Sequence, residues 1–285
     1  MAVTITFPEF QLPGEFPLVT TNDRPWSAAE LGALAERFGM TERPVDRGLW
    51  HVALSDSHLL EVYAASRSFR WAPIGRGSEL DTATEAGLHP DKATDRAFDF
   101  MKEFQPERTE LVVRSVTESE VLISQKAHAE ARRLVLATEV NLGYVLDGQV
   151  GFVGPGAKTQ VCLSADGEVL SAHRMWRDVV DAGSLQARSM DEIATAFGES
   201  SAFQQLSDDT AGVEVTSAVA GLYAMPPTET QEVFVPAVEV RGSITTEHAT
   251  VGFATYVAAV SRSDTRKALR AHDRRRQPVP SAIVA

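Results

Sequence analysis

The stretch Tyr144–Lys158, YVLDGQVGFVGPGAK, decides the fold because its four glycines suit either a phosphate-binding loop or a series of β-turns. A phosphate loop needs a Gly-Lys-Ser/Thr ending followed at once by a helix, whose N–H groups face the anion. Here Ala157 stands where the second glycine belongs, and Gln160–Leu163 reads as a strand. A dinucleotide-binding loop also needs a helix directly after it, and no helical pattern follows at once. The stretch is therefore predicted to turn strands.

Three dipeptides place the turns. Asp147-Gly148 and Asp166-Gly167 are typical of tight hairpins, and Pro155-Gly156 fits a type II turn in which the glycine takes the positive φ. Runs of β-forming residues flank these dipeptides, so residues 109–176 are predicted to form a series of antiparallel strands.

Three helices are predicted between groups of strands. Ser27 with Glu30, and Ser189 with Glu192, each form the Ser-x-x-Glu capping box that marks a helix start, and Asp91 is the expected cap of the second helix. Each helix precedes several strand candidates. This order predicts an α+β fold, in which antiparallel sheets pack on short helices, and disfavours a parallel dinucleotide-binding fold.

The chain is expected to divide into three segments. Residues 1–88 hold an extended N-terminal arm, expected on a sheet edge, and a first helix-plus-hairpin unit that ends in a glycine-bearing loop. Residues 89–261 hold one or more larger α+β units with an antiparallel sheet. Residues 262–285 form a basic C-terminal helix and tail.

Composition limits the partners. A net charge of -12 over 285 residues disfavours nucleic-acid binding, which needs a concentrated basic surface. Arg262–Arg276 is a local exception with seven Lys and Arg residues, and a nucleic-acid accessory role for it is the weakest of three hypotheses. A solvated last helix is the favoured interpretation.

The cysteine, histidine and hydropathy patterns disfavour disulfide-linked, metal-binding and membrane-spanning proteins. The single cysteine, Cys162, rules out a disulfide within the chain and is predicted to be a small buried hydrophobe. The seven histidines lack metal-ligand spacing, so neither a metal nor another cofactor is expected. The N-terminus has no leader pattern and no apolar run reaches 18 residues, which predicts a cytoplasmic protein without membrane contact.

The hairpin VCLSADGEVLSAHRMW, residues 161–176, resembles that of PepSY-type domains, in which a strand, a D-G-E-V turn and a second strand pack on a preceding helix. Together with GLYAMPPTETQEVFVPAVEVRGS, residues 221–243, it is similar to tandem PepSY-like or YycI-like proteins of high-GC bacteria. LLEVYAASRSFRW, residues 59–71, looks like a degenerate first copy. The resemblance implies tandem cystatin-like units that regulate or inhibit partner proteins and share no catalytic residues. No leader or membrane anchor is predicted in this sequence, so the chain is expected to depart from the family in this respect.

Three strand residues are candidates for chemistry. Alternation places His173 on one face of its strand and Arg174 on the other, where each could meet a cavity. Glu139 lies in an otherwise apolar strand, and burial would raise the pKa of its carboxyl as an acid or base requires. The favoured alternative is that Glu139 faces water on a half-exposed sheet.

Five aromatic residues on or beside predicted strands are candidates to line a concave sheet and bind an apolar ligand: Trp50, Trp71, Tyr144, Trp176 and Tyr223. The favoured alternative is that they belong to the core.

Two functional hypotheses lead. The first is a PepSY-like binding protein that uses a curved antiparallel sheet to bind an apolar small molecule or a protein partner, with a homodimer left open. The second is a cofactor-independent cyclase or isomerase of bacterial specialised metabolism, with a pocket between the α+β units. There Glu139 or His173 would act as acid or base and Arg174 would hold an anionic group.

Overall fold

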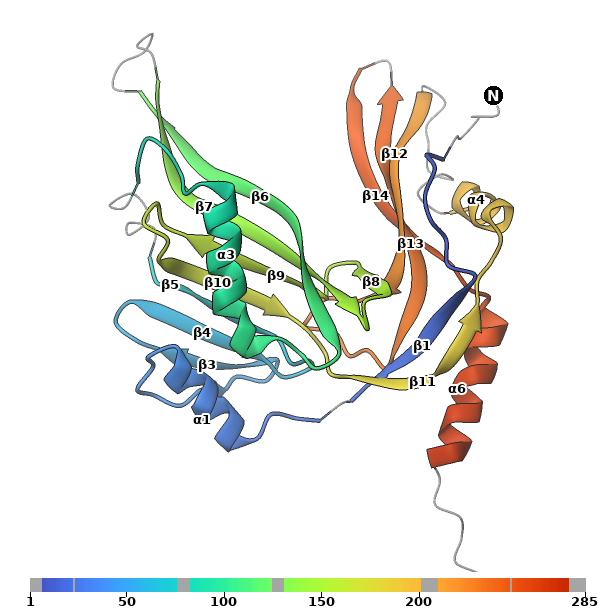
Figure 1. The fold of residues 1–285 in the computed structure, drawn as a ribbon, viewed down its shortest axis with the longest axis horizontal. Helices are drawn as coiled ribbons and strands as arrows, with labels where there is room; N and C mark the ends of the chain where they lie inside the picture. Colours follow the sequence, from blue (N-terminus) through green and yellow to red (C-terminus); the bar gives the residue numbers. More distant parts are fainter. Residues whose placement is uncertain are drawn as a thin grey trace, which may run out of the picture. The chain divides into compact units, whose positions relative to one another are not determined.

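The structure is a computed structural model, and it describes residues 7–22, 24–75, 83–124, 131–200, 210–246 and 248–276 (Figure 1). The chain forms two compact units. The central unit comprises Asp23–Asp178 and Met225–Thr230. The terminal unit combines both ends of the chain, Met1–Asn22, Val179–Ala224 and Gln231–Ala285.

The central unit is built on an antiparallel sheet with the strand order β2-β3-β4-β5-β10-β9-β7-β6, and β8 pairs with the end of β7. The strands span Val45–Asp46 (β2), Trp50–Leu54 (β3), His58–Tyr63 (β4), Phe69–Pro73 (β5), Thr109–Ile123 (β6), Arg132–Leu146 (β7), Val150–Val153 (β8), Lys158–Leu163 (β9) and Val169–Met175 (β10).

The glycine-rich stretch turns strands, as predicted. Asp147 and Gly148 both have positive φ, at 49° and 67°, which is the type I′ geometry of the β7–β8 hairpin. β9 begins at Lys158, where a phosphate loop would begin a helix. One detail differs, because Gly154 rather than Gly156 takes the positive φ in the next turn.

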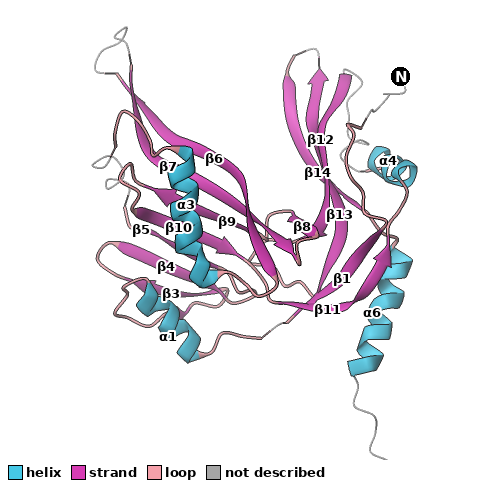
Figure 2. Ribbon diagram, in the orientation of Figure 1, coloured by secondary structure: helices cyan, strands magenta, loops and turns pink. Residues whose placement is uncertain are grey.

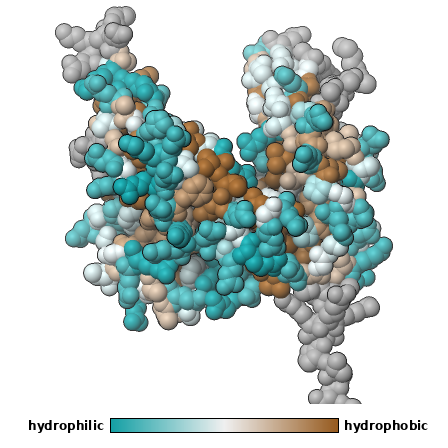
Figure 3. Space-filling model, in the orientation of Figure 1, coloured by the Kyte–Doolittle hydropathy of each residue, from teal (hydrophilic) through white to brown (hydrophobic). Residues whose placement is uncertain are grey.

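Within the described residues, two helices cover one face of this sheet. They are α1 (Ala28–Arg37) and α3 (Pro90–Met101), and the 3-10 helix η1 (Lys102–Phe104) follows α3. Apolar residues of α1 pack with Ala172, and those of α3 pack with Val161. Because Ala172 and Val161 are cross-strand partners, both helices lie on the same face. Figure 2 shows α3 across the strands, and its outward surface is hydrophilic in Figure 3.

Local signals at the helix starts are confirmed with one correction. Ser27 and Ser189 cap α1 and α4 (Met190–Gly198) with complete capping boxes. The cap of α3 is His89, whose side chain accepts a hydrogen bond from the backbone N–H of Asp91. Asp91 therefore lies in the first turn and is not the cap, because Pro90 already occupies the first helical position.

The terminal unit has its own antiparallel sheet, in the order β11-β1-β13-β12, with β14 also paired to β13. Its strands are Glu15–Thr21 (β1), Val179–Gln186 (β11), Thr210–Tyr223 (β12), Val233–Thr246 (β13) and Thr250–Ala258 (β14). The predicted edge position of the N-terminal arm is wrong. β1 lies between β11 and β13 and pairs with both.

The described part of the terminal unit also contains helices α4 and α6 (Arg262–Arg276). Phe197 of α4 is fully buried. Its ring is stacked on the ring of Phe253 in β14, and the two ring centroids lie 6.1 Å apart. α6 packs against β11, so the basic C-terminal helix belongs to this unit. In the part of the chain that the structure describes, no helix combines the length and apolar character needed to cross a membrane.

The observed units confirm an α+β fold with antiparallel sheets on short helices. The expected segment boundary at residue 88 lies inside the central unit, because β5 pairs with β10 and joins both sides of that boundary in one sheet. Segments 1–22 and 179–224 lie in one unit although more than half of the chain separates them.

Candidate functional site

Two of the predicted catalytic residues lie on the face of the central sheet opposite α1 and α3, called here the open face. His173 pairs across the strands with Arg70 on one side and Gln160 on the other. Gln160 Nε2 donates to Glu139 Oε2 at 3.1 Å and to Asn141 Oδ1 at 3.4 Å. Glu139 is half-buried and bonded to Gln160, so it shares the open face with His173, but β9 lies between their strands.

The environment of His173 keeps it neutral. Burial, followed by the positive charges of Arg70 and Lys158, lowers the pKa of His173 to about 4. Its Nε2 is buried and has no hydrogen-bond partner in the described structure. The imidazole is therefore uncharged at neutral pH but is a weak base, because an efficient general base has a pKa near the working pH.

Arg174 is directed away from the other two candidates. It follows His173 in β10, so its side chain lies on the helix-covered face of the sheet. Its Nη1 donates to the carbonyl oxygen of Arg67 at 2.7 Å, and the residue is only 8% exposed. The three predicted catalytic residues therefore do not form one site.

Two of the aromatic candidates are core residues. Trp176 and Tyr144 are fully buried, and their ring centroids lie 4.7 Å apart. The hydroxyl of Tyr144 is 2.7 Å from Thr159 Oγ1 in a buried hydrogen bond. This position corrects the prediction that these two side chains line a ligand surface, because neither reaches solvent.

The remaining aromatic candidates are dispersed. Trp50 is half-buried and pairs with Tyr63 of β4. Trp71 lies on the helix-covered face, with its ring stacked 4.3 Å from that of His58. Tyr223 belongs to the terminal unit. The five candidates therefore do not share one concave surface, because their strands place them on different faces and in different units.

A pocket of about 270 Å³ lies on the helix-covered face of the central unit and is called here the arginine pocket. Side chains from α1 and η1 and from the ends of β5 and β10 line it. Trp26, Phe69 and Phe104 supply its aromatic surface, and Arg67 and Arg174 line it from the strand side. Among the described residues, it is a candidate functional site, because its apolar and charged groups converge in a concave space.

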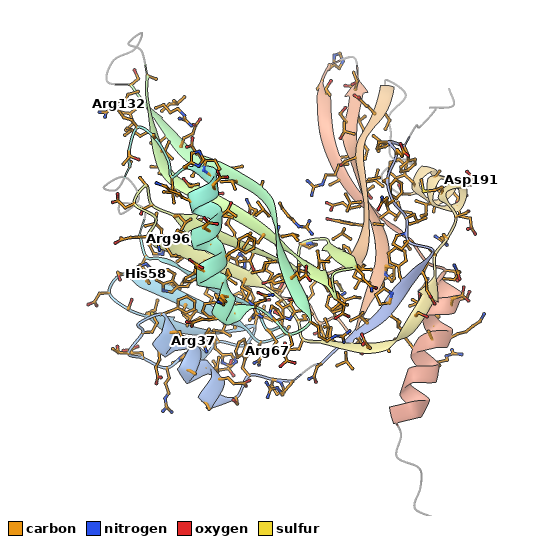
Figure 4. The ribbon with its side chains drawn as sticks, in the orientation of Figure 1. Arg37, His58, Arg67, Arg96, Arg132 and Asp191 are labelled. Atoms are coloured by element: carbon orange, nitrogen blue, oxygen red, sulfur yellow. The ribbon has the colours of Figure 1, made fainter. Side chains whose placement is uncertain are left out.

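Packing explains the shape of the pocket. The rings of Phe38, Phe69 and Phe104 form a cluster, with Phe38 and Phe104 stacked 5.6 Å apart and Phe69 5.1 Å from Phe104. This cluster links the C-terminal end of α1 to η1 and to β5. The guanidinium carbon of Arg37 lies 5.6 Å from the centre of the Phe104 ring, so a cation lies at the aromatic side of the pocket. Figure 4 labels Arg37 and Arg67, two of the arginines that line the pocket.

Arg67 is held by three kinds of contact. Its guanidinium carbon lies 3.7 Å from the centre of the Trp26 ring. Its Nη2 is 2.7 Å from Glu30 Oε1, and its Nε is 3.6 Å from Asp178 Oδ2. Its Nη1 and the Nε of Arg174 are buried without a hydrogen-bond partner in the described structure.

Glu30 connects the helix cap to the pocket. The backbone N–H of Ser27 donates to its carboxylate, and this bond, followed by the hydrogen bond from Arg67, lowers the pKa of Glu30 to about 2. The carboxylate is therefore charged at every pH where the protein is expected to work. It orients Arg67 and at the same time completes the α1 capping box.

Acid should weaken the central unit through Glu30. The folded-state pKa lies below the unfolded value of 4.5, so the stabilisation is complete above pH 4.5 and is lost as the pH falls toward 2. We expect Glu30→Gln to flatten the dependence of unfolding free energy on pH within this window, measured by urea denaturation. Glu36→Gln, at an exposed position of α1, is the charge-matched control. An unchanged slope in Glu30→Gln would contradict this role.

Sequence reasoning missed the arginine pocket. Its parts come from residues 26–37, 67–69, 103–105 and 174, and no local pattern connects them. Two of its residues have a signal in the sequence: Glu30 completes a capping box and Arg174 is predicted to hold an anionic group, but neither pattern indicates a shared pocket. Within the described ranges, no three His, Cys, Asp or Glu side chains gather closely enough to hold a metal ion. Cys162 is half-buried rather than fully buried.

No protein-family model matches this chain, and no curated protein sequence matches it. Among solved structures, an uncharacterized protein from Eubacterium rectale is similar, with a TM-score of 0.51 and 10% sequence identity, over 87% of this chain and 85% of that chain. At this identity the similarity shows the fold alone.

Proposed function

We propose that this chain is a PepSY-like binding protein with tandem cystatin-like units, and that it holds a small molecule with an apolar body in the arginine pocket. The observation that carries the proposal is the concave space of about 270 Å³ with Trp26, Phe69 and Phe104 in its lining. Small-molecule sites are concave, mostly apolar and lined by aromatic side chains, with a few placed polar groups.

The strand pattern of the central unit supports the tandem arrangement. α1 packs on β3, β4 and β5, and α3 packs on β7 and β9 of the other half of the sheet. The last strands of the two halves, β5 and β10, pair edge to edge. Each half is a helix on an antiparallel sheet, which is the layering that the resemblance to PepSY-like proteins implies.

The placement of the charged residues favours binding over catalysis. His173 and Glu139 lie on the open face, whereas the pocket lies on the helix-covered face. A ligand in the pocket is therefore separated by the sheet from both candidates for proton transfer. General acid–base catalysis needs such groups within hydrogen-bond reach of the reacting atom.

The proposal is tested with 2-naphthoate as the probe, followed by two-dimensional ¹H–¹⁵N NMR. We expect saturable shifts of the Trp26 indole signal and of the backbone amides of residues 102–105. A probe of ~13 non-hydrogen atoms at about 0.3 kcal/mol per atom should bind with a dissociation constant of about 1 mM or lower. Native mass spectrometry of freshly purified protein checks for a carried molecule.

A pair of matched variants locates the binding. Ala33 is exposed on α1 and lines the pocket, so Ala33→Trp should occupy the space and abolish the saturable shifts. Ala28 is exposed on the same helix and does not line the pocket, so Ala28→Trp should bind as the wild type does. Saturable binding that survives in Ala33→Trp would show that the pocket is not the site, and an absence of saturation in wild type would refute the proposal.

A further inference from the structure

Two donors in the arginine pocket lack an acceptor. Arg67 Nη1 and Arg174 Nε are both buried, and neither has a hydrogen-bond partner in the described structure. Buried N–H groups of charged side chains are almost always paired, because leaving them unpaired costs free energy. Two such groups on residues that line the same pocket indicate a missing acceptor from outside the chain.

Both guanidinium groups are positioned in advance. Arg174 is 8% exposed, and its Nη1 is bound to the carbonyl oxygen of Arg67 at 2.7 Å. Arg67 is stacked on Trp26 and bound to Glu30 by its Nη2. Because these contacts use other atoms of the two side chains, Nη1 and Nε stay unpaired in the described structure. Both atoms are buried, so a ligand oxygen reaches them only when side chains that line the pocket shift.

The charges of the pocket select a monoanion. Three arginines line it, Arg37, Arg67 and Arg174, together with the two carboxylates of Glu30 and Glu103, so three positive less two negative charges leave one positive charge. A dianion such as hydrogen phosphate would exceed this charge, and the two lining carboxylates would repel it more strongly than they repel a monoanion. A carboxylate carries one charge and accepts hydrogen bonds from arginine readily.

We infer that the arginine pocket binds the carboxylate of a small monocarboxylic acid, with Arg67 Nη1 and Arg174 Nε donating to its oxygens. The apolar body of the acid packs against Trp26, Phe69 and Phe104. This inference rests on the proposed binding function and adds the chemical class of the ligand. It also assigns Arg174 a role in binding that does not depend on His173 or Glu139.

The first experiment compares 2-naphthoate with 2-naphthamide, which has the same shape without the charge. Hydrogen bonds to charged groups contribute enough for a difference of about 10- to 100-fold in dissociation constant, with naphthoate binding more tightly. The measurement is the NMR titration of the wild-type protein, so it depends on no variant. Inorganic phosphate is titrated in parallel and is expected to bind more weakly than naphthoate.

The second experiment replaces Arg174 with lysine, which keeps the charge and removes the Nε donor. Arg174→Lys should raise the dissociation constant of naphthoate about 10-fold and leave that of naphthamide unchanged. Arg70→Lys is the matched control, because Arg70 is exposed in the neighbouring strand β5, faces away from the pocket and should bind both probes as wild type does. Thermal unfolding checks that each variant folds. If Arg174→Lys does not fold, the comparison of naphthoate with naphthamide in the wild-type protein decides the question.

The outcomes separate the two proposals. Equal affinity for naphthoate and naphthamide in wild type would overturn the carboxylate assignment and leave small-molecule binding intact. Tighter binding of phosphate than of naphthoate at the same residues would also overturn it. If neither naphthoate nor naphthamide gives saturable shifts, the binding function itself is refuted.

Discussion

Trp176→Ala is expected to lower the free energy of unfolding of the central unit by about 3–5 kcal/mol. Trp176 is fully buried, and its ring contacts those of Tyr144 and Phe152, with centroids 4.7 Å and 5.2 Å away. Removal of the indole leaves a cavity in a packed core and exposes none of the surface that a ligand would contact. The measurement is urea unfolding followed by circular dichroism.

The control separates a core role from a ligand-binding role. Trp50→Ala removes the same side chain from a half-buried position. Its loss of unfolding free energy should be less than half of the loss caused by Trp176→Ala. If Trp176→Ala were nearly neutral while ligand binding was lost, the core assignment would be wrong. Trp176 would then rejoin the candidate ligand-binding residues.

Gly242→Ala is expected to destabilise the terminal unit by about 3 kcal/mol or more. A Cβ at Gly242 would lie 2.0 Å from the carbonyl oxygen of Glu214 and 2.8 Å from the ring of Phe253. The irregular pairing between Val215 and Ser217 in β12 accompanies this close approach. A backbone carbonyl within a sheet cannot move aside as the end of a flexible side chain can, so the strands must separate locally.

Gly252→Ala provides the comparison for Gly242→Ala. Gly252 lies in the paired strand β14, and the nearest atom to its Cβ would be 3.9 Å away, an ordinary contact distance. The free energy of unfolding of Gly252→Ala, measured by thermal denaturation, should lie within about 0.5 kcal/mol of the wild-type value. Similar melting temperatures for the two variants would contradict the steric explanation, and amide hydrogen exchange in β12–β14 would show whether the loss is local.

Turns and helix starts were predictable because their causes lie within a few residues of sequence. Asp147-Gly148 adopts the two positive φ angles of a hairpin turn, and Ser27 and Ser189 cap their helices through glutamates three residues later. The alternation of β10 also placed His173 and Arg174 on opposite faces of the sheet. These features need no knowledge of distant residues.

Strand partners and the pocket were not predictable in this way. β1 pairs with β11, which lies some 160 residues later, and no prediction identified β11 as a strand. Partner choice depends on long-range packing, because many strands have similar local patterns. The aromatic candidates illustrate the same point, since Trp50 and Trp176 have similar sequence contexts, yet only Trp176 is enclosed on all sides.

By itself, the sequence determined the α+β class, the turns of the central hairpins and the starts of α1 and α4, since backbone preferences and short-range hydrogen bonds decide these. Only the tertiary structure decided that β5 joins β10 and that Arg67, Arg174, Trp26 and Phe104 meet around one pocket. The physical reason is that burial of apolar side chains brings remote segments together, so the pocket is lined by residues that no local sequence pattern connects.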